Sequence, residues 1–423
     1  MSTSTPLTNI RIADLTNVIA GPVATRVLGH LGAEIIKVEL PWGRAIGNIA
    51  MHGDNGDSRA YNKVKTFNEV NRAKKSIAID LTHETGKNLF KEIVSVSDIV
   101  IQNYSPRVMG NLGLAYENLR KVKPDIIMVS MPALGLEGPW SNYISFGPGT
   151  DALGGLSSVT GYKNGRPHKP GNFYADHNSG FHVATGIMAS LFRKYQTGEG
   201  QHLEIVLREA TMSVIGEYFI EYQFRGKEPE RLGNDHPVFF PHGIFACKGS
   251  DSWIAISIES EKEWHSLCEL IGATDLKNDS SLVKVDSRRL ISQKIEAQIT
   301  KWTMQRDNKQ VMHLMQNQGI RAGIVAKASD LLSDEHVAER EYLDTVEHPD
   351  AGTYTSPGLP FKFSRASTNL GVTAPMFSEH SLHLLSELLA KDTETIKSLV
   401  DLGTTPLEPV SYTHLTLPTI LRV

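Results

Sequence analysis

The sequence of 423 residues is poor in cysteine, with only Cys247 and Cys268, and it carries no excess of charge of either sign. Two cysteines cannot form the disulfide framework of a small secreted protein, so we expect two buried, unreactive thiols and a reducing compartment. The 43 Lys and Arg residues against 47 Asp and Glu residues leave a net charge of -4, which argues against nucleic acid as the main partner.

The sequence also lacks long hydrophobic runs and the usual signals of export. No apolar run approaches the length of a membrane-spanning helix, and the start, Met-Ser-Thr-Ser-Thr-Pro, has no basic stretch before an apolar core. Histidine pairs such as His236 and His242, or His380 and His383, are not accompanied by a Glu-x-x-His or cysteine-pair motif, so no metal site is expected. We therefore expect a cytoplasmic protein with no membrane partner.

Short β-branched runs alternate with helical stretches in the first half of the chain. Strands are expected over 10–15, 34–38, 76–81, 98–101, 125–129 and 203–207. This alternation indicates repeated βαβ units and an α/β fold with a Rossmann-like parallel sheet, which binds ligands at the carboxyl ends of its strands. Residues 131–170, rich in Gly, Ser, Pro and aromatics, are expected to form a long loop before a helix that begins near Gly180.

The chain is longer than one usual domain, so two domains are expected. The predicted organisation is a large domain over 1–224, a linker over 225–241, a smaller α+β domain over 242–341, a linker over 342–373, and helices over 374–406 that return to the large domain. Residues 407–423 are expected to be non-native, because 410–419 bear no relation to what precedes them and resemble translated sequencing adapter.

Segment 169–180, Lys-Pro-Gly-Asn-Phe-Tyr-Ala-Asp-His-Asn-Ser-Gly, places one carboxylate where a loop broken by glycine and proline meets a helix. As an N-cap, Asp176 would accept hydrogen bonds from the free amides of the first turn. As a nucleophile, it would be favoured by the positive end of the helix dipole and would form a covalent intermediate with a carbonyl compound. The residues alone favour the cap.

Two other segments carry polar groups beside expected strands. Arg72, Lys74 and Lys75 precede the strand at 76–81, and a solvated edge is the simplest interpretation of this basic cluster. Tyr104 follows the strand at 98–101 and is either a core aromatic or part of a ligand site with the amide beside it.

The segment Gly147-Pro148-Gly149 matches a loose dinucleotide fingerprint. Because it does not directly follow a strand, a nicotinamide dehydrogenase is disfavoured.

Several short motifs, in their order and spacing, resemble the class III CoA-transferases, the family that includes formyl-CoA:oxalate, crotonobetaine and benzylsuccinate CoA-transferases. The resemblance extends over nearly the whole chain. Its motifs are Asp14-Leu15-Thr16 with Ala20-Gly21-Pro22, Leu-Gly-Ala-Glu-Ile-Ile-Lys-Val-Glu over 31–39, Asn-Arg-Ala-Lys-Lys-Ser-Ile over 71–77, Gln-Asn-Tyr-Ser-Pro over 102–106, the Asp176 segment, and Thr-Gly-Glu-Gly-Gln over 197–201. Each motif alone is weak, but the ordered set is specific.

The resemblance implies that Asp176 is the catalytic aspartate of an acyl-CoA:carboxylate CoA-transferase, with acyl-CoA, coenzyme A and carboxylic acids as substrates and no tightly bound cofactor. It implies a CoA site formed by Ile19, Ala20, Asn71, Arg72, Lys74, Asn103, Tyr104 and Arg107, in which basic side chains and backbone amides neutralise phosphates. It also implies a ring-shaped monomer that interlocks with a second copy, and therefore a homodimer.

Two departures from the family pattern, and one difference from the racemases, bear on the reaction. Ile19 stands where several relatives carry glutamine, and segment 238–243 replaces a glycine-rich loop of the oxalate-type enzymes, so a less polar acyl group is expected than in formyl-CoA:oxalate transfer. An α-methylacyl-CoA racemase is the main alternative, but Phe146 stands where racemases carry a histidine, which favours transfer. A non-catalytic CoA-binding protein, which would form no hydroxylamine-sensitive adduct at Asp176, is the other alternative.

Overall fold

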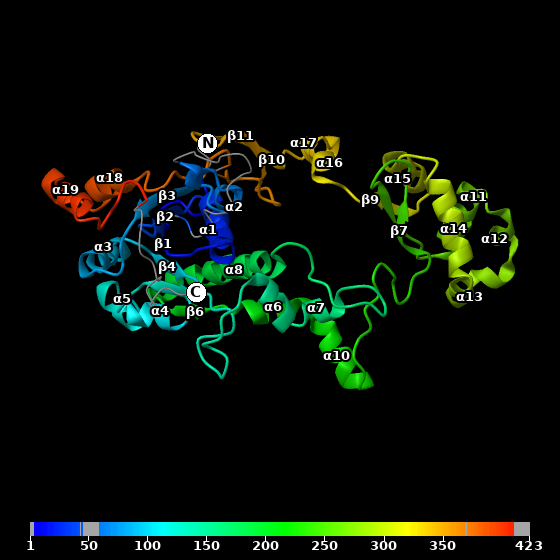
Figure 1. The fold of residues 1–423 in the computed structure, drawn as a ribbon, viewed down its shortest axis with the longest axis horizontal. Coiled ribbons are helices and arrows are strands. Elements are labelled where there is room, and N and C mark those ends of the chain that lie inside the picture. Colours follow the sequence, from blue (N-terminus) through cyan, green and yellow to red (C-terminus); the bar gives the residue numbers. More distant parts are fainter. Residues whose placement is uncertain (1–3, 43, 45–58, 369, 410–423) are drawn as a thin grey trace. The chain divides into compact units, whose positions relative to one another are not determined.

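The computed structural model describes residues 4–42, 44, 59–368 and 370–409 (Figure 1). These residues divide into two compact units. Unit 1 takes its described residues from Met1–Leu156, Lys169–Ile220 and Glu339–Val423, and unit 2 consists of Ser157–His168 and Glu221–Ala338. The tail expected to be non-native lies, from residue 410 onward, outside the described residues.

Unit 1 is built on a six-stranded parallel sheet. Its strands are β1 (Arg11–Asp14), β2 (Glu34–Glu39), β3 (Lys74–Ala78), β4 (Ile99–Gln102), β5 (Ile127–Ser130) and β6 (His202–Glu204). Their order across the sheet is β3-β2-β1-β4-β5-β6, a Rossmann order, so the predicted parallel α/β fold is confirmed. Every residue of β4 and β5 is buried, as their nearly continuous apolar sequences predict.

Helices cover both faces of this sheet. Ile35 and Ile101 pack with α1 and α8 on one face, whereas Ile36 and Val100 pack with α3 and α5 on the other, because neighbouring residues of a strand point to opposite faces. The helices of this part of the chain are α1 (Ala20–His30), α2 (Lys65–Val70), α3 (Glu84–Ser95), α4 (Arg107–Asn111), α5 (Tyr116–Val122), α6 (Gly147–Leu153), α7 (Leu156–Val159), α8 (Tyr174–Thr197), α9 (Leu207–Met212) and α10 (Gly216–Arg225), with 3-10 turns at Ala60–Lys63 and Ser213–Ile215.

The region 131–170 differs from the expected long loop, because it contains the short helices α6 and α7. The long helix α8 begins at Tyr174 and not near Gly180. The residue before the helix, Phe173, has a left-handed backbone (φ 54°), and its side chain makes no capping hydrogen bond. The helix therefore begins without the usual N-cap signal that sequence analysis relies on.

The edge strand β3 is covered by residues from the end of the chain. The backbone amide of His380 donates to the carbonyl of Ser76 at 2.9 Å, and the amide of Asp80 donates to the carbonyl of Thr404 at 2.9 Å. The elements there are α18 (Ser381–His383), a π-helical turn (Leu384–Leu388) and α19 (Thr393–Asp401). Covering an edge strand with these residues prevents it from pairing with another chain.

The segment expected as a linker over 342–373 contains an antiparallel hairpin, β10 (Leu343–His348) and β11 (Gly352–Pro357).

Unit 2 contains a three-stranded antiparallel sheet, β7 (His242–Ala246), β8 (Trp253–Ser257) and β9 (Arg321–Ile324), in that order. One face of this sheet packs on helices through Phe245, Ile254 and Ile256. The helices are α11 (Glu261–Leu270), α12 (Thr274–Asn278), α13 (Val285–Leu290), α14 (Ser292–Thr303), α15 (Asn308–Asn317), α16 (Ala328–Leu332) and α17 (Glu335–Glu339), with a 3-10 turn at Ser280–Val283. Both cysteines are buried as free thiols in this apolar core.

Candidate active site

Asp176 lies in the first turn of α8, where it is the third residue of the helix. The expected N-cap position is therefore wrong, because the helix begins two residues before Asp176. The residue is 6% exposed, and its Oδ2 atom has no hydrogen-bond partner among the described residues. A buried carboxylate oxygen without a partner is costly to maintain, and such groups occur most often where a ligand supplies the missing contact.

Gly147, the first residue of α6, packs directly against this oxygen. A Cβ atom added at position 147 would lie 1.8 Å from Oδ2 of Asp176. Any side chain at this position would therefore displace the carboxylate. The glycine that resembled part of a dinucleotide fingerprint instead gives the Asp176 side chain room beside the backbone of α6.

The electrostatic surroundings make this carboxylate more basic than an ordinary aspartate. Burial raises the pKa of Asp176 to about 6; the adjacent His177 acts against this rise, and the carboxylate of Asp151 adds to it. A group with this pKa is still mostly ionised at neutral pH. It therefore combines a negative charge with the higher basicity that suits a nucleophile.

The structure brings Ile19 and Ala20 to the beginning of α8. A Cβ atom added at Gly180, one turn after Asp176, would lie 2.8 Å from the carbonyl oxygen of Ala20. Ile19 packs in a small apolar cluster that includes Phe173, the residue before α8. Both residues follow β1, so the carboxyl end of this strand lies beside the helix that carries the carboxylate.

Asn103 directly follows β4, the neighbour of β1 at the point where the strand order reverses, which is where sheets of this type bind ligands. Its side-chain oxygen accepts a hydrogen bond from the amide of Asn17 at 2.7 Å, and its side-chain nitrogen donates to the carbonyl of Asn17 at 2.8 Å. Tyr104 is buried in the core of unit 1, and burial raises the pKa of its hydroxyl. Of the two interpretations, a core aromatic or part of a ligand site, the first describes the position of the Tyr104 side chain.

Residues 141–147 link these two parts of the site. Asn103 and Tyr104 line a small pocket together with Ser141, Tyr143, Ile144 and Ser145. The chain then continues through Phe146, which is 53% exposed, to Gly147 at the carboxylate of Asp176. Phe146 carries no ionisable group, so this position supplies no acid or base beside Asp176.

Two members of the basic cluster at the start of β3, Arg72 and Lys74, are buried, whereas the side chain of Lys75 is 35% exposed. Arg72 has no exposed surface, and its guanidinium group donates to the carbonyl of Pro357 at 3.0 Å and pairs with Asp344. The interpretation as a solvated edge is therefore wrong for these two residues. Arg72 is enclosed by segments later in the chain, whereas the ammonium group of Lys74 points inward to Asp14 and Asn71. Contact of either side chain with CoA phosphates stays a prediction.

Lys74 belongs to a buried network around Asp14 at the end of β1. Its Nζ atom lies 3.1 Å from Oδ2 of Asp14 and 2.8 Å from the side-chain oxygen of Asn71. Burial opposes the ionised form of Asp14, but the ammonium groups of Lys74 and Lys37 lower its pKa to about 2. Asn71 is therefore held in place by its hydrogen bond to Lys74.

Arg107, by contrast, is the first residue of α4, lies four residues after Asn103, and is exposed.

Sequence reasoning missed a pocket at the carboxyl ends of β1 and β2. It is lined by Thr16, Asn17, Val18, Pro22, Lys37, Glu39, Leu40, Arg44, Phe67 and Asn71. Within it, Nε of Arg44 lies 2.9 Å from Glu39, and the guanidinium group stacks 3.5 Å from the ring centroid of Phe67. The sequence feature that could have indicated this pocket is the pair of charged residues Lys37 and Glu39 near the end of a buried strand.

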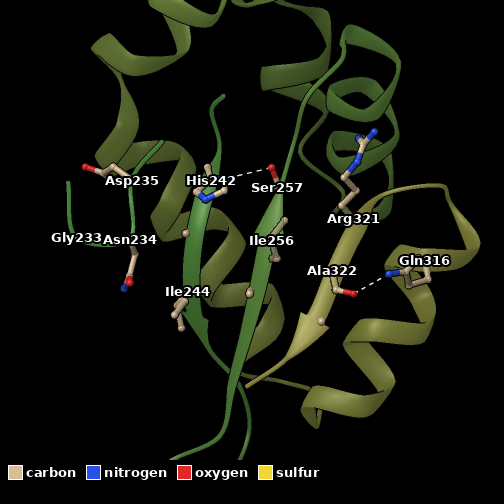
Figure 2. Close-up of a pocket in the computed structure, with 13 residues that line it drawn as sticks. Gly233, Asn234, Asp235, His242, Ile244, Ile256, Ser257, Gln316, Arg321 and Ala322 are labelled. Atoms are coloured by element: carbon tan, nitrogen blue, oxygen red, sulfur yellow. Dashed lines mark hydrogen bonds between the residues drawn. The ribbon is translucent and has the colours of Figure 1, made fainter. Parts of the chain in front are cut away.

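A separate hollow lies on unit 2, where His242, Ser257 and Arg321 occupy neighbouring positions of the three strands (Figure 2). The Nδ1 atom of His242 lies 3.0 Å from the hydroxyl of Ser257. Arg321 pairs with Glu263, which neutralises its charge. In the part of the chain that the structure describes, no group of three or more His, Cys, Asp or Glu residues could hold a metal ion, and no helix could span a membrane.

Asp176 is thus a buried carboxylate of raised pKa on a helix that packs against a parallel sheet of Rossmann order. The profile described as CoA-transferase family III matches residues 7–381, and the chain belongs to this family. It is an enzyme that transfers CoA between acyl-CoA and carboxylic acids. The family membership predicted from the ordered motifs is therefore confirmed.

Known relatives are similar over nearly their whole length. The chain is 31% identical to a succinyl-CoA:mesaconate CoA-transferase of Haloarcula hispanica, over 90% of this chain and 96% of the relative. It is 29% identical to a succinyl-CoA:glutarate CoA-transferase of Homo sapiens, over 95% of this chain and 90% of the relative. A solved structure of a CaiB/BaiF family protein from Brucella suis superposes with a TM-score of 0.82 at 27% identity, covering 91% of this chain and all (100%) of the other.

Proposed function

We propose that the chain transfers CoA through covalent intermediates on the side chain of Asp176. The carboxylate attacks the thioester carbonyl of the donor acyl-CoA, the carbon–sulfur bond breaks, and CoA leaves as a thiolate. The product is a mixed anhydride between the aspartyl group and the donor acyl group. The thiolate then attacks the aspartyl carbonyl, which releases the donor acid and leaves an aspartyl-CoA thioester.

The second half of the reaction repeats these steps in reverse with the acceptor. The acceptor carboxylate attacks the aspartyl-CoA thioester and expels the thiolate, and the thiolate attacks the acyl carbonyl of the new anhydride. The products are the acceptor's CoA thioester and the free carboxylate of Asp176. Anhydride and thioester are similarly activated, so the reaction needs no external energy source, and every step needs water to be kept out.

One observation carries this proposal: Oδ2 of Asp176 is buried without a hydrogen-bond partner among the described residues, packed against Gly147 where an added Cβ atom would lie 1.8 Å away. The raised pKa supports the same role, because burial has weakened the solvation that makes an ordinary carboxylate a poor nucleophile. Ile19, Ala20, Asn103 and the exposed Arg107 form the CoA-binding edge in this proposal. Asn71, Arg72, Lys74 and Tyr104 support this edge from the interior, with Asn71 also lining the pocket.

Trapping of the covalent intermediate tests the role of Asp176. We expect wild-type enzyme incubated with succinyl-CoA and hydroxylamine to lose activity and to carry a hydroxamate on Asp176, detected by peptide mass spectrometry. We expect Asp176→Ala to lose transfer by at least about 1,000-fold and to form no adduct. The exposed Asp401, changed to Ala, is the matched control. Undiminished transfer by Asp176→Ala contradicts the proposal.

We further propose succinyl-CoA as the donor and a five-carbon dicarboxylic acid as the acceptor. Two similar enzymes, from an archaeon and from human, carry names that specify succinyl-CoA with mesaconate or glutarate. A panel of acyl-CoA donors with mesaconate, glutarate and oxalate as acceptors checks this choice. The departures at Ile19 and at 238–243 support a low rate with oxalate.

We also propose that two chains form an interlocked, ring-shaped homodimer in the cytoplasm, where acyl-CoA thioesters are available. An exposed apolar stripe on α8 supports the dimer, since Phe181, Met188, Phe192 and Tyr195 are 46%, 40%, 64% and 90% exposed. Their spacing places them on one face of the helix. A contiguous apolar stripe of this kind marks an interaction surface.

A further inference from the structure

Asp151 and Gly147 lie one helical turn apart on α6 and face the start of α8. A Cβ atom added at Gly147 would lie 1.8 Å from Oδ2 of Asp176, and Oδ1 of Asp151 accepts a hydrogen bond from the amide of Ala175 at 3.2 Å. Residues four apart share one face of a helix. One face of α6 therefore contacts both the carboxylate of Asp176 and the backbone of the residue before it.

The first turn of α8 depends on this acceptor because it has no cap of its own. Phe173 precedes the helix, and its side chain offers no oxygen to the free amides. The amides of a first helical turn have no partner within the helix. Asp151, which is 1% exposed, thus supplies from a second helix the oxygen that an N-cap residue normally supplies.

The charge of Asp151 also acts on its neighbour. Burial is the largest cause of the raised pKa of Asp176; the Asp151 carboxylate acts in the same direction and His177 in the opposite one. Burial raises the pKa of Asp151 itself, and the amide of Ala175 and the cation of Lys169 act against this rise. A second anion close by makes a carboxylate more basic and therefore a stronger nucleophile.

We propose that Asp151 is a positioning residue for the reaction: it fixes the first turn of α8 and keeps an anion beside the carboxylate that attacks the thioester. This inference rests on the proposed role of Asp176. Asp151 forms no bond to the substrate and acts only through Asp176 and the backbone of Ala175.

Two variants separate the hydrogen bond from the charge. Asp151→Asn keeps an acceptor oxygen and removes the charge, whereas Asp151→Ala removes both. CoA transfer from succinyl-CoA to glutarate is measured from about pH 5 to about pH 9. We expect the acid limb of kcat/KM to move to lower pH in Asp151→Asn, because loss of the neighbouring charge lowers the pKa of Asp176. We expect kcat of Asp151→Ala to fall roughly 10- to 100-fold, with little change in KM for acyl-CoA.

The control is Asp307→Asn, which removes the charge of a capping aspartate in unit 2, where Asp307 accepts from the amide of Gln310 at 2.8 Å. We expect this variant to keep the wild-type pH profile and kcat. A wild-type acid limb and kcat in Asp151→Asn would overturn the proposal. The proposal would also be overturned if the activity lost by Asp151→Ala were fully explained by a smaller fraction of folded protein, as measured by circular dichroism. A different result would show that the proposed function itself is wrong, namely undiminished CoA transfer by Asp176→Ala.

Discussion

The side chain of Asp176 is held in surroundings that oppose its ionisation. Burial raises its pKa from the usual 3.8 to about 6, so the folded protein holds this proton more tightly than the unfolded chain does. For such a group, the stability of the fold falls as the pH rises from about 4 through about 6. A carboxylate kept for reaction therefore costs stability at the pH where it is useful.

Asp176→Asn should be more stable than the wild type at neutral pH. The pKa rise from 3.8 to about 6 corresponds to at most about 3 kcal/mol of unfolding free energy above pH 6. The gain should shrink as the pH falls and vanish below about pH 4, where the wild-type carboxyl group is protonated in both states. Urea unfolding over this pH range measures it. Equal stability differences at acid and neutral pH, or a less stable variant at pH 8, would contradict this account.

The motif around Asp176 pointed to the carboxylate, but not to the residues that surround it. Asp151 lies 24 residues earlier in the chain than Ala175, and the partners of Lys74 and Arg72 lie 60 and 272 residues away at Asp14 and Asp344. Charged residues usually lie on the solvated surface, so analysis of a sequence predicts that such residues are exposed even where they form buried pairs. Only the fold shows which distant charges meet.

Elements with a strong local pattern were predictable, and those without one were not. The strands of the parallel sheet carry runs of β-branched residues because both of their faces are buried. The β10–β11 hairpin was missed because β11, Gly-Thr-Tyr-Thr-Ser-Pro, has few apolar residues and is mostly exposed. The start of α8 was missed because its capping oxygen comes from another helix.

Arg72 anchors this hairpin to the sheet, and its loss should destabilise the fold. Arg72→Met removes a fully buried cation that bonds to the carbonyl of Pro357 and pairs with Asp344. Breaking one partner of a buried pair costs about 3–5 kcal/mol, and we expect the lower end because Asp344 is 15% exposed. Urea unfolding measures the change. The double variant with Asp344→Leu should recover part of the loss; a single variant as stable as the wild type would show that Arg72 is no anchor.

At the scale of the whole molecule, the apolar stripe on α8 is a large exposed feature of the described residues. Helix α10 has a similar character, since none of its residues is buried and Phe224 is 87% exposed. Apolar surface of this extent on two helices is unusual for a monomer. Association of two chains would remove it from water.

Phe192→Asp should separate the proposed dimer. Phe192 is 64% exposed in the middle of the stripe, and a carboxylate there would have to be buried without a partner on association. Size-exclusion chromatography with light scattering should give the mass of two chains for the wild type and of one chain for the variant. Leu290→Asp in unit 2, at a side chain that is 87% exposed, is the control and should leave the mass unchanged. A wild type with the mass of one chain would end the proposal of a dimer.

The bond between Asp80 and Thr404 joins an early strand to almost the last described turn of the chain. During synthesis on the ribosome, β3 is made long before the residues that shield its outer edge. The nascent protein thus carries an open edge until translation is nearly finished, which is a risk for aggregation. A premature stop codon upstream of residue 373 would leave that edge open permanently. Chaperones and proteases would then remove the product even though the motifs around Asp176 were intact.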